Sequence, residues 1–220
     1  MAAAPKLTSR EVEDLAPPGW VLLVDGLQTR IDVDDLASGA ALVSRIGAAA
    51  RERGHGPVLT LRSDAVDVRL TTPEVHGVTA DDVVLAETIT RLAEESGLTT
   101  ASTAVTRLEL ALDTPDLEAV SPFWAAVLGA EQRSGPDFGN EVRDATDTLP
   151  TVWFQRSGST EPRQHWHLDV WIDPAEVPAR INAARAAGGE LVSDAEAPAF
   201  WVLADPQGNK VCLCTWQSRD

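Results

Sequence analysis

His55 is the residue of the N-terminal half best placed for acid–base chemistry. It lies in the run Gly54-His55-Gly56-Pro57, between a segment with helical spacing and a segment that alternates like a strand. An imidazole exchanges protons near neutral pH, so a histidine at such a junction can act as a general acid or base on a bound molecule. The alternative is that His55 simply ends a helix at the surface.

A second group of ionisable residues recurs at alternate positions of the strands predicted in the C-terminal half. Their neighbours of opposite parity, such as Leu108, Leu110 and Leu168, are apolar and should face covering helices. A sheet face with carboxylates, imidazoles, thiols and indoles is either exposed to solvent or curves into a cup that binds a ligand. We predict that a small planar or apolar molecule binds there. The side chains expected to contact it are Glu109, Trp153, His167, Asp169, Trp171, Cys212 and Trp216.

Several of these residues also have an ordinary structural interpretation. Cys212 and Cys214 can be small buried side chains of a strand, and the tryptophans can be core residues. Trp171 and Trp216 share the polar parity, so their rings could instead stack on a planar ligand. Arg107, on the same face, could meet a ligand anion.

The residues before Leu98 predict the element order α-β-β-α-β-β-α. Hairpin turns are indicated at Asp25-Gly26 and Ser63-Asp64, and Gly54 closes the long helix between them. Ser9 caps the first helix and Thr79 caps the last, whose first turn is acidic. The other expected elements are Arg10–Leu15, Trp20–Val24, Thr29–Val33, Asp35–Arg53, Val58–Arg62 and Ala65–Thr71.

The residues after Thr106 repeat a smaller βαβββ unit twice. Its expected elements are Arg107–Asp113, Leu117–Leu128 and Thr151–Gln155, then His165–Ile172, Ala175–Ala187, Phe200–Ala204 and Lys210–Trp216. Between the halves, Leu98–Thr106 consists mostly of polar and small residues, as a linker does. We therefore predict an α+β protein of two domains, residues 1–101 and 104–220.

Composition excludes several classes of protein. The formal net charge of −16 repels phosphate backbones, and no cluster of Lys or Arg offsets it, so a nucleic-acid binder is not expected. No apolar run is long enough for a bilayer and no signal peptide is apparent, so no membrane partner is expected. The two cysteines, Cys212 and Cys214, are poorly spaced for a disulfide, which favours a cytoplasmic protein.

The N-terminal half resembles the pterin-4a-carbinolamine dehydratases over about residues 7–98. The resemblance rests on the element order, the His-x-Pro step at His55, Val68-Arg69-Leu70-Thr71-Thr72 and Val78-Thr79-Ala80-Asp81-Asp82. In that family three histidines surround the pterin and assist loss of its 4a-hydroxyl as water. Their positions fall here at His55, Gly56 and Pro73. An acidic residue expected one helical turn before the pair falls at Arg51, and His76 could substitute for a missing histidine only if its loop rearranged.

The C-terminal half resembles the glyoxalase/bleomycin-resistance group of the vicinal oxygen chelate superfamily over about residues 107–216. The resemblance rests on the paired units, Phe123-Trp124, His167-Leu168-Asp169-Val170 and Asp205-Pro206-Gln207-Gly208-Asn209. The metal ligands of that group would fall at Glu109, His167 and Cys212. Such a set could hold Zn²⁺, but a cysteine is a poor substitute for a carboxylate around a hard cation. We therefore expect no cofactor, with a metal at these residues as the alternative.

Three functions are compatible with these resemblances. The first is a pterin-4a-carbinolamine dehydratase, weak or inactive, with His55 as the remaining acid–base group and His76 assisting. The second is a non-catalytic protein that binds a metabolite such as a pterin and assembles as a homo-oligomer through its first domain. The third is a metal-dependent lyase or dioxygenase in the second domain.

Overall fold

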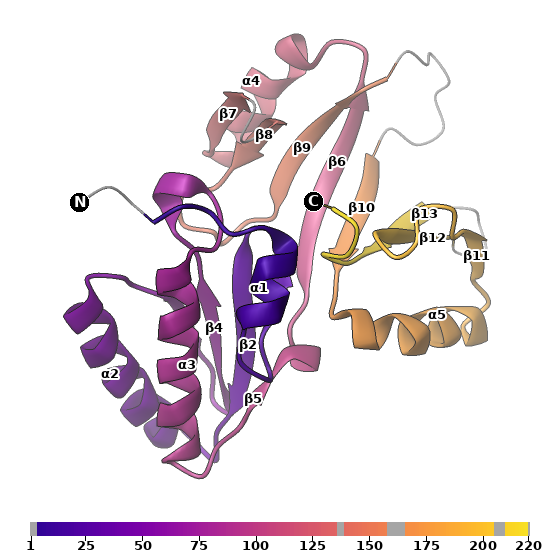
Figure 1. The fold of residues 1–220 in the computed structure, drawn as a ribbon. Coiled ribbons are helices and arrows are strands. Elements are labelled where there is room, and N and C mark those ends of the chain that lie inside the picture. Colours follow the sequence, from indigo (N-terminus) through magenta and orange to yellow (C-terminus); the bar gives the residue numbers. More distant parts are fainter. Residues whose placement is uncertain (1–3, 136–138, 158–165, 205–209, 220) are drawn as a thin grey trace. The chain divides into compact units, whose positions relative to one another are not determined.

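The computed structural model describes residues 4–135, 139–157, 166–204 and 210–219. The N-terminal domain has an antiparallel sheet with strand order β1-β2-β4-β3, and the short β5 pairs with β2 (Figure 1). Its strands are β1 (Val21–Leu23), β2 (Gly26–Asp32), β3 (Val58–Leu61), β4 (Ala65–Leu70) and β5 (Thr100–Ala101). Its helices are α1 (Ser9–Leu15), α2 (Leu36–Arg53) and α3 (Ala80–Glu94), with a short 3-10 turn, η1 (Pro73–Val75). The predicted order α-β-β-α-β-β-α is confirmed.

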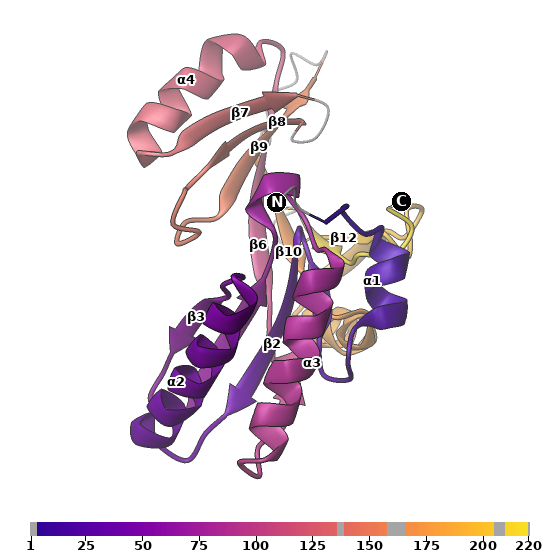
Figure 2. The same cartoon turned by 60° about the vertical axis from the view of Figure 1, so that its left-hand side comes forward.

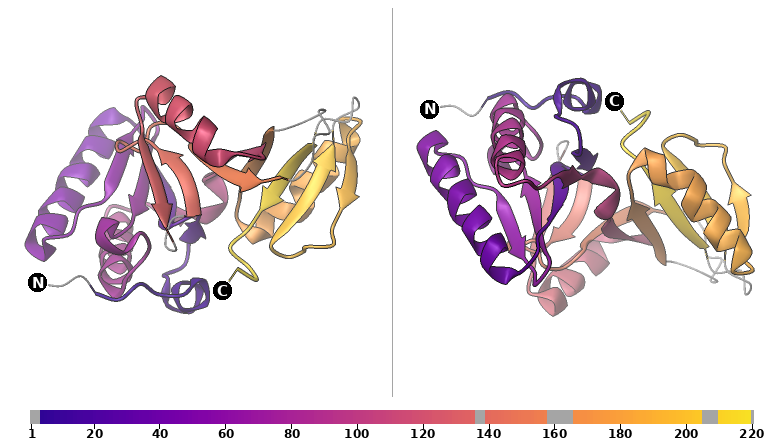
Figure 3. Two further views of the ribbon diagram at one scale, coloured as in Figure 1. Left: turned by 90° about the horizontal axis from the view of Figure 1, so that it is seen from above. Right: turned by 90° about the horizontal axis from the view of Figure 1, so that it is seen from below.

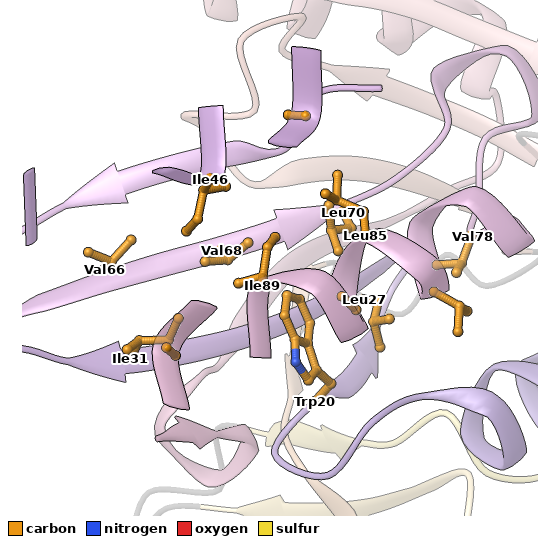
Figure 4. Packing of buried hydrophobic residues seen from close by; sticks show 14 of the residues in the cluster. Trp20, Leu27, Ile31, Ile46, Val66, Val68, Leu70, Val78, Leu85 and Ile89 are labelled. Atoms are coloured by element: carbon orange, nitrogen blue, oxygen red, sulfur yellow. The ribbon is translucent and has the colours of Figure 1, made fainter. Parts of the chain in front are cut away.

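Helices α2 and α3 lie side by side against one face of this sheet (Figure 2). Alternate residues of β2 and β4, such as Ile31 and Val68, are buried and meet Ile46 of α2 and Ile89 of α3 (Figure 4). This apolar layer keeps the end of α2 and the start of α3 in fixed places. One detail of the sequence prediction was wrong: Thr8, not Ser9, caps α1, because its side chain accepts the Glu11 N–H.

The C-terminal domain has an eight-stranded sheet with the order β11-β12-β13-β10-β6-β9-β8-β7. At its centre β6 (Arg107–Thr114) is antiparallel to β10 (Trp166–Trp171). Each central strand has a parallel neighbour from its own repeat, β9 (Thr151–Arg156) for β6 and β13 (Lys210–Cys214) for β10. The outer strands are β7 (Glu131–Gly135), β8 (Gly139–Arg143), β11 (Glu190–Ser193) and β12 (Phe200–Ala204). The predicted repeat of the βαβββ unit is confirmed.

One helix covers each repeat of this sheet. Helix α4 (Leu117–Leu128) packs on the first repeat, and α5 (Val177–Ala186), preceded by the 3-10 turn η3 (Pro174–Glu176), lies along the second (Figure 3). Under α4 the buried cluster contains Leu112, Val142, Val152 and Phe154. Leu110 and Leu112 of the apolar parity predicted for β6 pack in or against this cluster. For Leu108 of β6 and Leu168 of β10 the prediction was wrong, because they are 40% and 41% exposed rather than covered by a helix.

The chain divides into two compact units. Two short segments of the C-terminal half, Ile172–Glu176 and Trp216–Asp220, group with the unit that contains Met1–Thr106. Trp216, predicted as the last residue of a strand on the polar face, lies beyond the end of β13 and packs against the core of the first unit. Among the described residues no helix is both long enough and apolar enough to cross a membrane.

Candidate functional site

His55 is held directly after the C-terminal end of α2. Gly54 ends the helix in the left-handed conformation, with a φ of 66° that a side chain would strain. The His55 N–H then turns back to the Ala50 carbonyl at 3.2 Å. The run Gly54-His55-Gly56-Pro57 therefore folds as the sequence predicts, with the histidine at the junction between α2 and β3.

The imidazole of His55 contacts the carboxylate of Asp82. The Nε2–Oδ1 distance is 2.6 Å, and the side chain of Asp82 is fully buried while that of His55 is 15% exposed. Because an ionised carboxylate only accepts hydrogen bonds, Nε2 carries the proton of this contact. The other ring nitrogen, Nδ1, then carries a lone pair that can accept a proton.

Asp82 is fixed by a buried network of hydroxyls. Its Oδ2 accepts hydrogen bonds from Thr72 Oγ1 at 2.7 Å, from the Thr79 N–H at 2.8 Å and from Thr79 Oγ1 at 3.1 Å. The two threonine hydroxyls lie 3.0 Å apart. Thr79 and Asp82 are also the capping box that starts α3. With Oδ2 occupied in this way, Oδ1 is the oxygen that faces His55.

Asp82 and Thr72 are site residues that the sequence interpretation missed. The capping spacing of Thr79 and Asp82 indicates only that a helix begins there. The signal available was the resemblance itself, which extends over both residues. No local pattern shows that the start of α3 meets the end of α2, because that contact depends on how the two helices pack on the sheet.

A pocket of about 460 Å³ opens beside His55. Its lining residues are Gly47, Ala50, Arg51, Gly54, His55, Gly56, Pro57 and Leu59. A Cβ built at Gly47 or Gly56 would have no heavy atom within 4 Å, so both positions leave open space. His76 is not among the lining residues; it ends η1 with a φ of 47°. The pocket therefore contains one of the two predicted histidines.

The polar face of the C-terminal sheet brings three predicted residues into one row. Glu109 of β6 lies opposite Asp169 of β10, which lies opposite Cys212 of β13. The Trp171 indole Nε1 donates to Glu109 Oε2 at 2.8 Å, and both Trp171 and Asp169 are only 8% exposed. The predicted parity thus places an indole and two carboxylates on this face.

Two other predicted residues of this face, Trp153 and His167, lie on either side of Ala111 of β6. Trp153 of β9 is half-buried and lies opposite Ala111. His167 also lies opposite Ala111, on the other side of β6, and its side chain falls outside what the structure describes, as does the run from Asp205 to Asn209. Among the described residues no three His, Cys, Asp or Glu side chains gather as metal ligands would. The alternative set Glu109, His167 and Cys212 includes the undescribed His167 side chain.

Arg107 of β6 is already paired with a carboxylate. It forms an ion pair with Asp147, and Arg143 lies 3.7 Å from the same carboxylate. Asp147 follows a turn ordered by Asp144. Hydrogen bonds from the Thr146 hydroxyl, and from the N–H groups of Thr146, Thr148 and Leu149, lower the pKa of Asp144 to about 2. Arg107 is therefore occupied within the domain and does not offer an open anion site.

Two family profiles match this chain. The profile described as pterin 4 alpha carbinolamine dehydratase matches residues 5–92, and the profile described as glyoxalase-like domain matches residues 109–214. A putative pterin-4-alpha-carbinolamine dehydratase of Halobacterium salinarum is 33% identical over 81 residues, which cover 37% of this chain and 89% of that protein. A protein of the same description from Thermosynechococcus vestitus is 37% identical over 76 residues, covering 34% and 80%.

Solved structures resemble each half. A transcriptional coactivator/pterin dehydratase from Brucella melitensis is 23% identical with a TM-score of 0.39, and the match covers 40% of this chain and 98% of that one. A glyoxalase/bleomycin resistance protein/dioxygenase superfamily member from Vibrio splendidus is 18% identical with a TM-score of 0.34, covering 50% and 98%.

Proposed function

We propose that this chain, which belongs to the pterin-4a-carbinolamine dehydratase family through its N-terminal domain and carries a glyoxalase-like domain after it, binds a 4a-hydroxytetrahydropterin beside His55 and removes water from it. The observation that carries the proposal is the His55–Asp82 contact of 2.6 Å at the edge of an open pocket. A histidine oriented by a buried carboxylate is suited to proton transfer.

The elimination needs one proton removed and one proton delivered. The C4a–O bond breaks while a double bond forms between C4a and N5, so N5 loses its proton and the hydroxyl leaves as water. His55 can accept the N5 proton on Nδ1, and the negative charge of Asp82 stabilises the imidazolium that results. The same imidazolium can then give a proton to the departing hydroxyl. One histidine can thus serve both transfers, at a lower rate than separate groups at the Gly56 and Pro73 positions would give.

Replacing His55 tests this proposal. His55→Ala is expected to lower the enzyme-catalysed dehydration rate by about 10²–10⁴-fold, because it removes the proton carrier. The measurement is stopped-flow absorbance of a 4a-hydroxytetrahydropterin generated in situ, corrected for the uncatalysed reaction. His76→Ala is the comparison and should keep most of the rate, since His76 does not line the pocket. Full activity in His55→Ala would rule the mechanism out.

A second candidate function belongs to the C-terminal domain, as a binding module for a small planar or apolar molecule. It is supported by the buried Trp171 indole beside Glu109 on the polar face, where a ring is partly shielded from water. We propose that this binding needs no metal. Assembly as a homo-oligomer and a cytoplasmic location are further proposals. Cys212 and Cys214 are not joined in a disulfide, which suits a reducing compartment.

Removing metal should leave ligand binding in the C-terminal domain unchanged. The expected result is the same quenching of tryptophan fluorescence by biopterin before and after treatment with a chelator. Metal analysis of the untreated protein accompanies the titration. Binding that disappears with the chelator, together with stoichiometric metal that is lost in His167→Ala, would instead support the metal-dependent alternative.

A further inference from the structure

We infer that the pocket beside His55 selects a pterin that carries an anionic substituent, a carboxylate or a phosphate, and that Arg51 is the residue that recognises it. This inference rests on the proposed function, in which a pterin occupies the pocket. It concerns the part of the ligand that does not react, and it assigns a specificity role to a residue that stands where the resemblance leads one to expect an acid.

The charge of the pocket lining differs from that of the whole chain. The protein has 34 acidic and 18 basic residues. The lining nevertheless has two ionisable side chains, Arg51 and His55, and neither is acidic. Asp82 touches His55 from the buried side and is not part of the lining. A ligand in this pocket therefore meets positive charge in a protein whose overall field is negative.

Arg51 differs from the other arginines of the N-terminal domain in having no hydrogen-bond acceptor among the residues that the structure describes. The arginines that form ion pairs with carboxylates there are Arg10, Arg30, Arg45, Arg62, Arg69 and Arg91. Arg53 reaches the Thr88 hydroxyl at 3.4 Å. Within the described part of the chain, the Arg51 guanidinium makes no hydrogen bond or ion pair. Its donors are free to bind a ligand oxyanion.

The helix places Arg51 and the open space on one side. Gly47, Ala50, Arg51 and Gly54 are spaced three, four and seven residues apart, so they share the face of α2 that lines the pocket. Gly47 has no side chain and Ala50 only a methyl group, so they leave space above this face of the helix. Pro57 and Leu59 form an apolar wall on the β3 side. A flat pterin ring can lie between the helix face and this wall, with its reacting edge at His55 and an anionic substituent at Arg51. The planar guanidinium of an arginine binds a carboxylate or a phosphate with two hydrogen bonds.

Arg53 supplies a matched control. Both arginines lie in the last turn of α2, where a cation interacts favourably with the helix dipole, and both are exposed. Arg53 does not line the pocket. If Arg51 served only the helix end or the net charge, replacing either arginine would have the same effect.

The test measures affinities by isothermal titration calorimetry at 150 mM salt for pterin-6-carboxylate, neopterin monophosphate and the neutral 6-hydroxymethylpterin. The wild-type protein is expected to bind the better of the two anions about tenfold more tightly than the neutral pterin, as one charge-assisted contact allows. Arg51→Ala should remove this preference and change the affinity for the neutral pterin by less than about twofold. Arg51→Glu should invert the preference, and Arg53→Ala should preserve it.

The outcomes separate the inference from the function on which it rests. If no pterin binds at all, the proposed function fails. If the neutral pterin binds as tightly as both anions, or if Arg53→Ala loses the preference as Arg51→Ala does, the role of Arg51 is overturned while the pterin site stands. The two anionic probes also show which oxyanion the guanidinium prefers.

Discussion

Installing histidine at the two other family positions, Gly56→His with Pro73→His, is expected to raise the dehydration rate by about 10²-fold or more, because each imidazole used in proton transfer typically contributes that much. The wild-type protein must move both protons with His55. Two added imidazoles would let one group accept the N5 proton while another protonates the leaving hydroxyl. The measurement is the same stopped-flow assay, with rates compared at saturating pterin.

The structure can accommodate both substitutions. A Cβ at Gly56 has no heavy atom within 4 Å, and its backbone is not in the region reserved for glycine. Pro73 is exposed at the first position of η1, directly after Thr72, whose hydroxyl binds Asp82. A histidine there begins one residue from the network that orients His55.

Two controls make the gain interpretable. Gly56→Ala with Pro73→Ala changes the backbone in the same way but adds no imidazole, and it should leave the rate near that of the wild type. Adding His55→Ala to the histidine pair should remove most of the gain, since the new groups act with His55. A folded, pterin-binding double variant that is no faster than wild type would show that the missing histidines are not what limits the reaction.

Periodicity predicted most of the fold because short-range rules decide it. Gly54 ends α2 because glycine adopts the left-handed conformation without strain, and Thr79 starts α3 through a capping box. Alternation in β6 predicted that Leu110 and Leu112 lie under α4, because side chains of a strand alternate strictly between faces. It did not predict that Leu108, on the same face, is 40% exposed, because alternation does not say how far a covering helix extends. The prediction that Trp216 lies on the polar face was wrong, because β13 ends at Cys214 and alternation between faces applies only within a strand.

Only part of the candidate site could be predicted from the sequence. His55 stood out by its chemistry and its place at a helix end. Its partner Asp82 lies 27 residues later. In the sequence Asp82 looks like any acidic residue in the first turn of a helix, and Asp81 beside it is acidic too. The contact between His55 and Asp82 is a product of tertiary packing, and no local spacing encodes it. The role inferred for Arg51 likewise depends on the pocket that it lines and on the absence of a hydrogen-bond acceptor for it among the described residues.

Removing the Asp82 carboxylate is expected to cost both stability and activity. Asp82→Ala deprives four donors of their acceptor: the His55 Nε2–H, the hydroxyls of Thr72 and Thr79 and the Thr79 N–H. Buried donors left without a partner cost about 1–3 kcal/mol each, and the lost cap of α3 adds about 1 kcal/mol, so a destabilisation of about 3–5 kcal/mol is expected after partial relaxation. Amide hydrogen exchange in α3 and β4 of the full chain measures this loss where it arises.

The isosteric change Asp82→Asn separates orientation from stability. The amide keeps the volume and one acceptor oxygen, so α3 should stay protected from exchange far better than in Asp82→Ala. An amide cannot stabilise an imidazolium, and its NH₂ group can present a donor to Nε2 and favour the wrong tautomer of His55. The dehydration rate of Asp82→Asn should therefore fall by at least about 10²-fold, close to that of His55→Ala. Asp81→Asn removes an equivalent charge from the same first turn, where the side chain is exposed, and should change neither protection nor rate. Equal rates in Asp81→Asn and Asp82→Asn would mean that the buried carboxylate only caps the helix and plays no part in proton transfer.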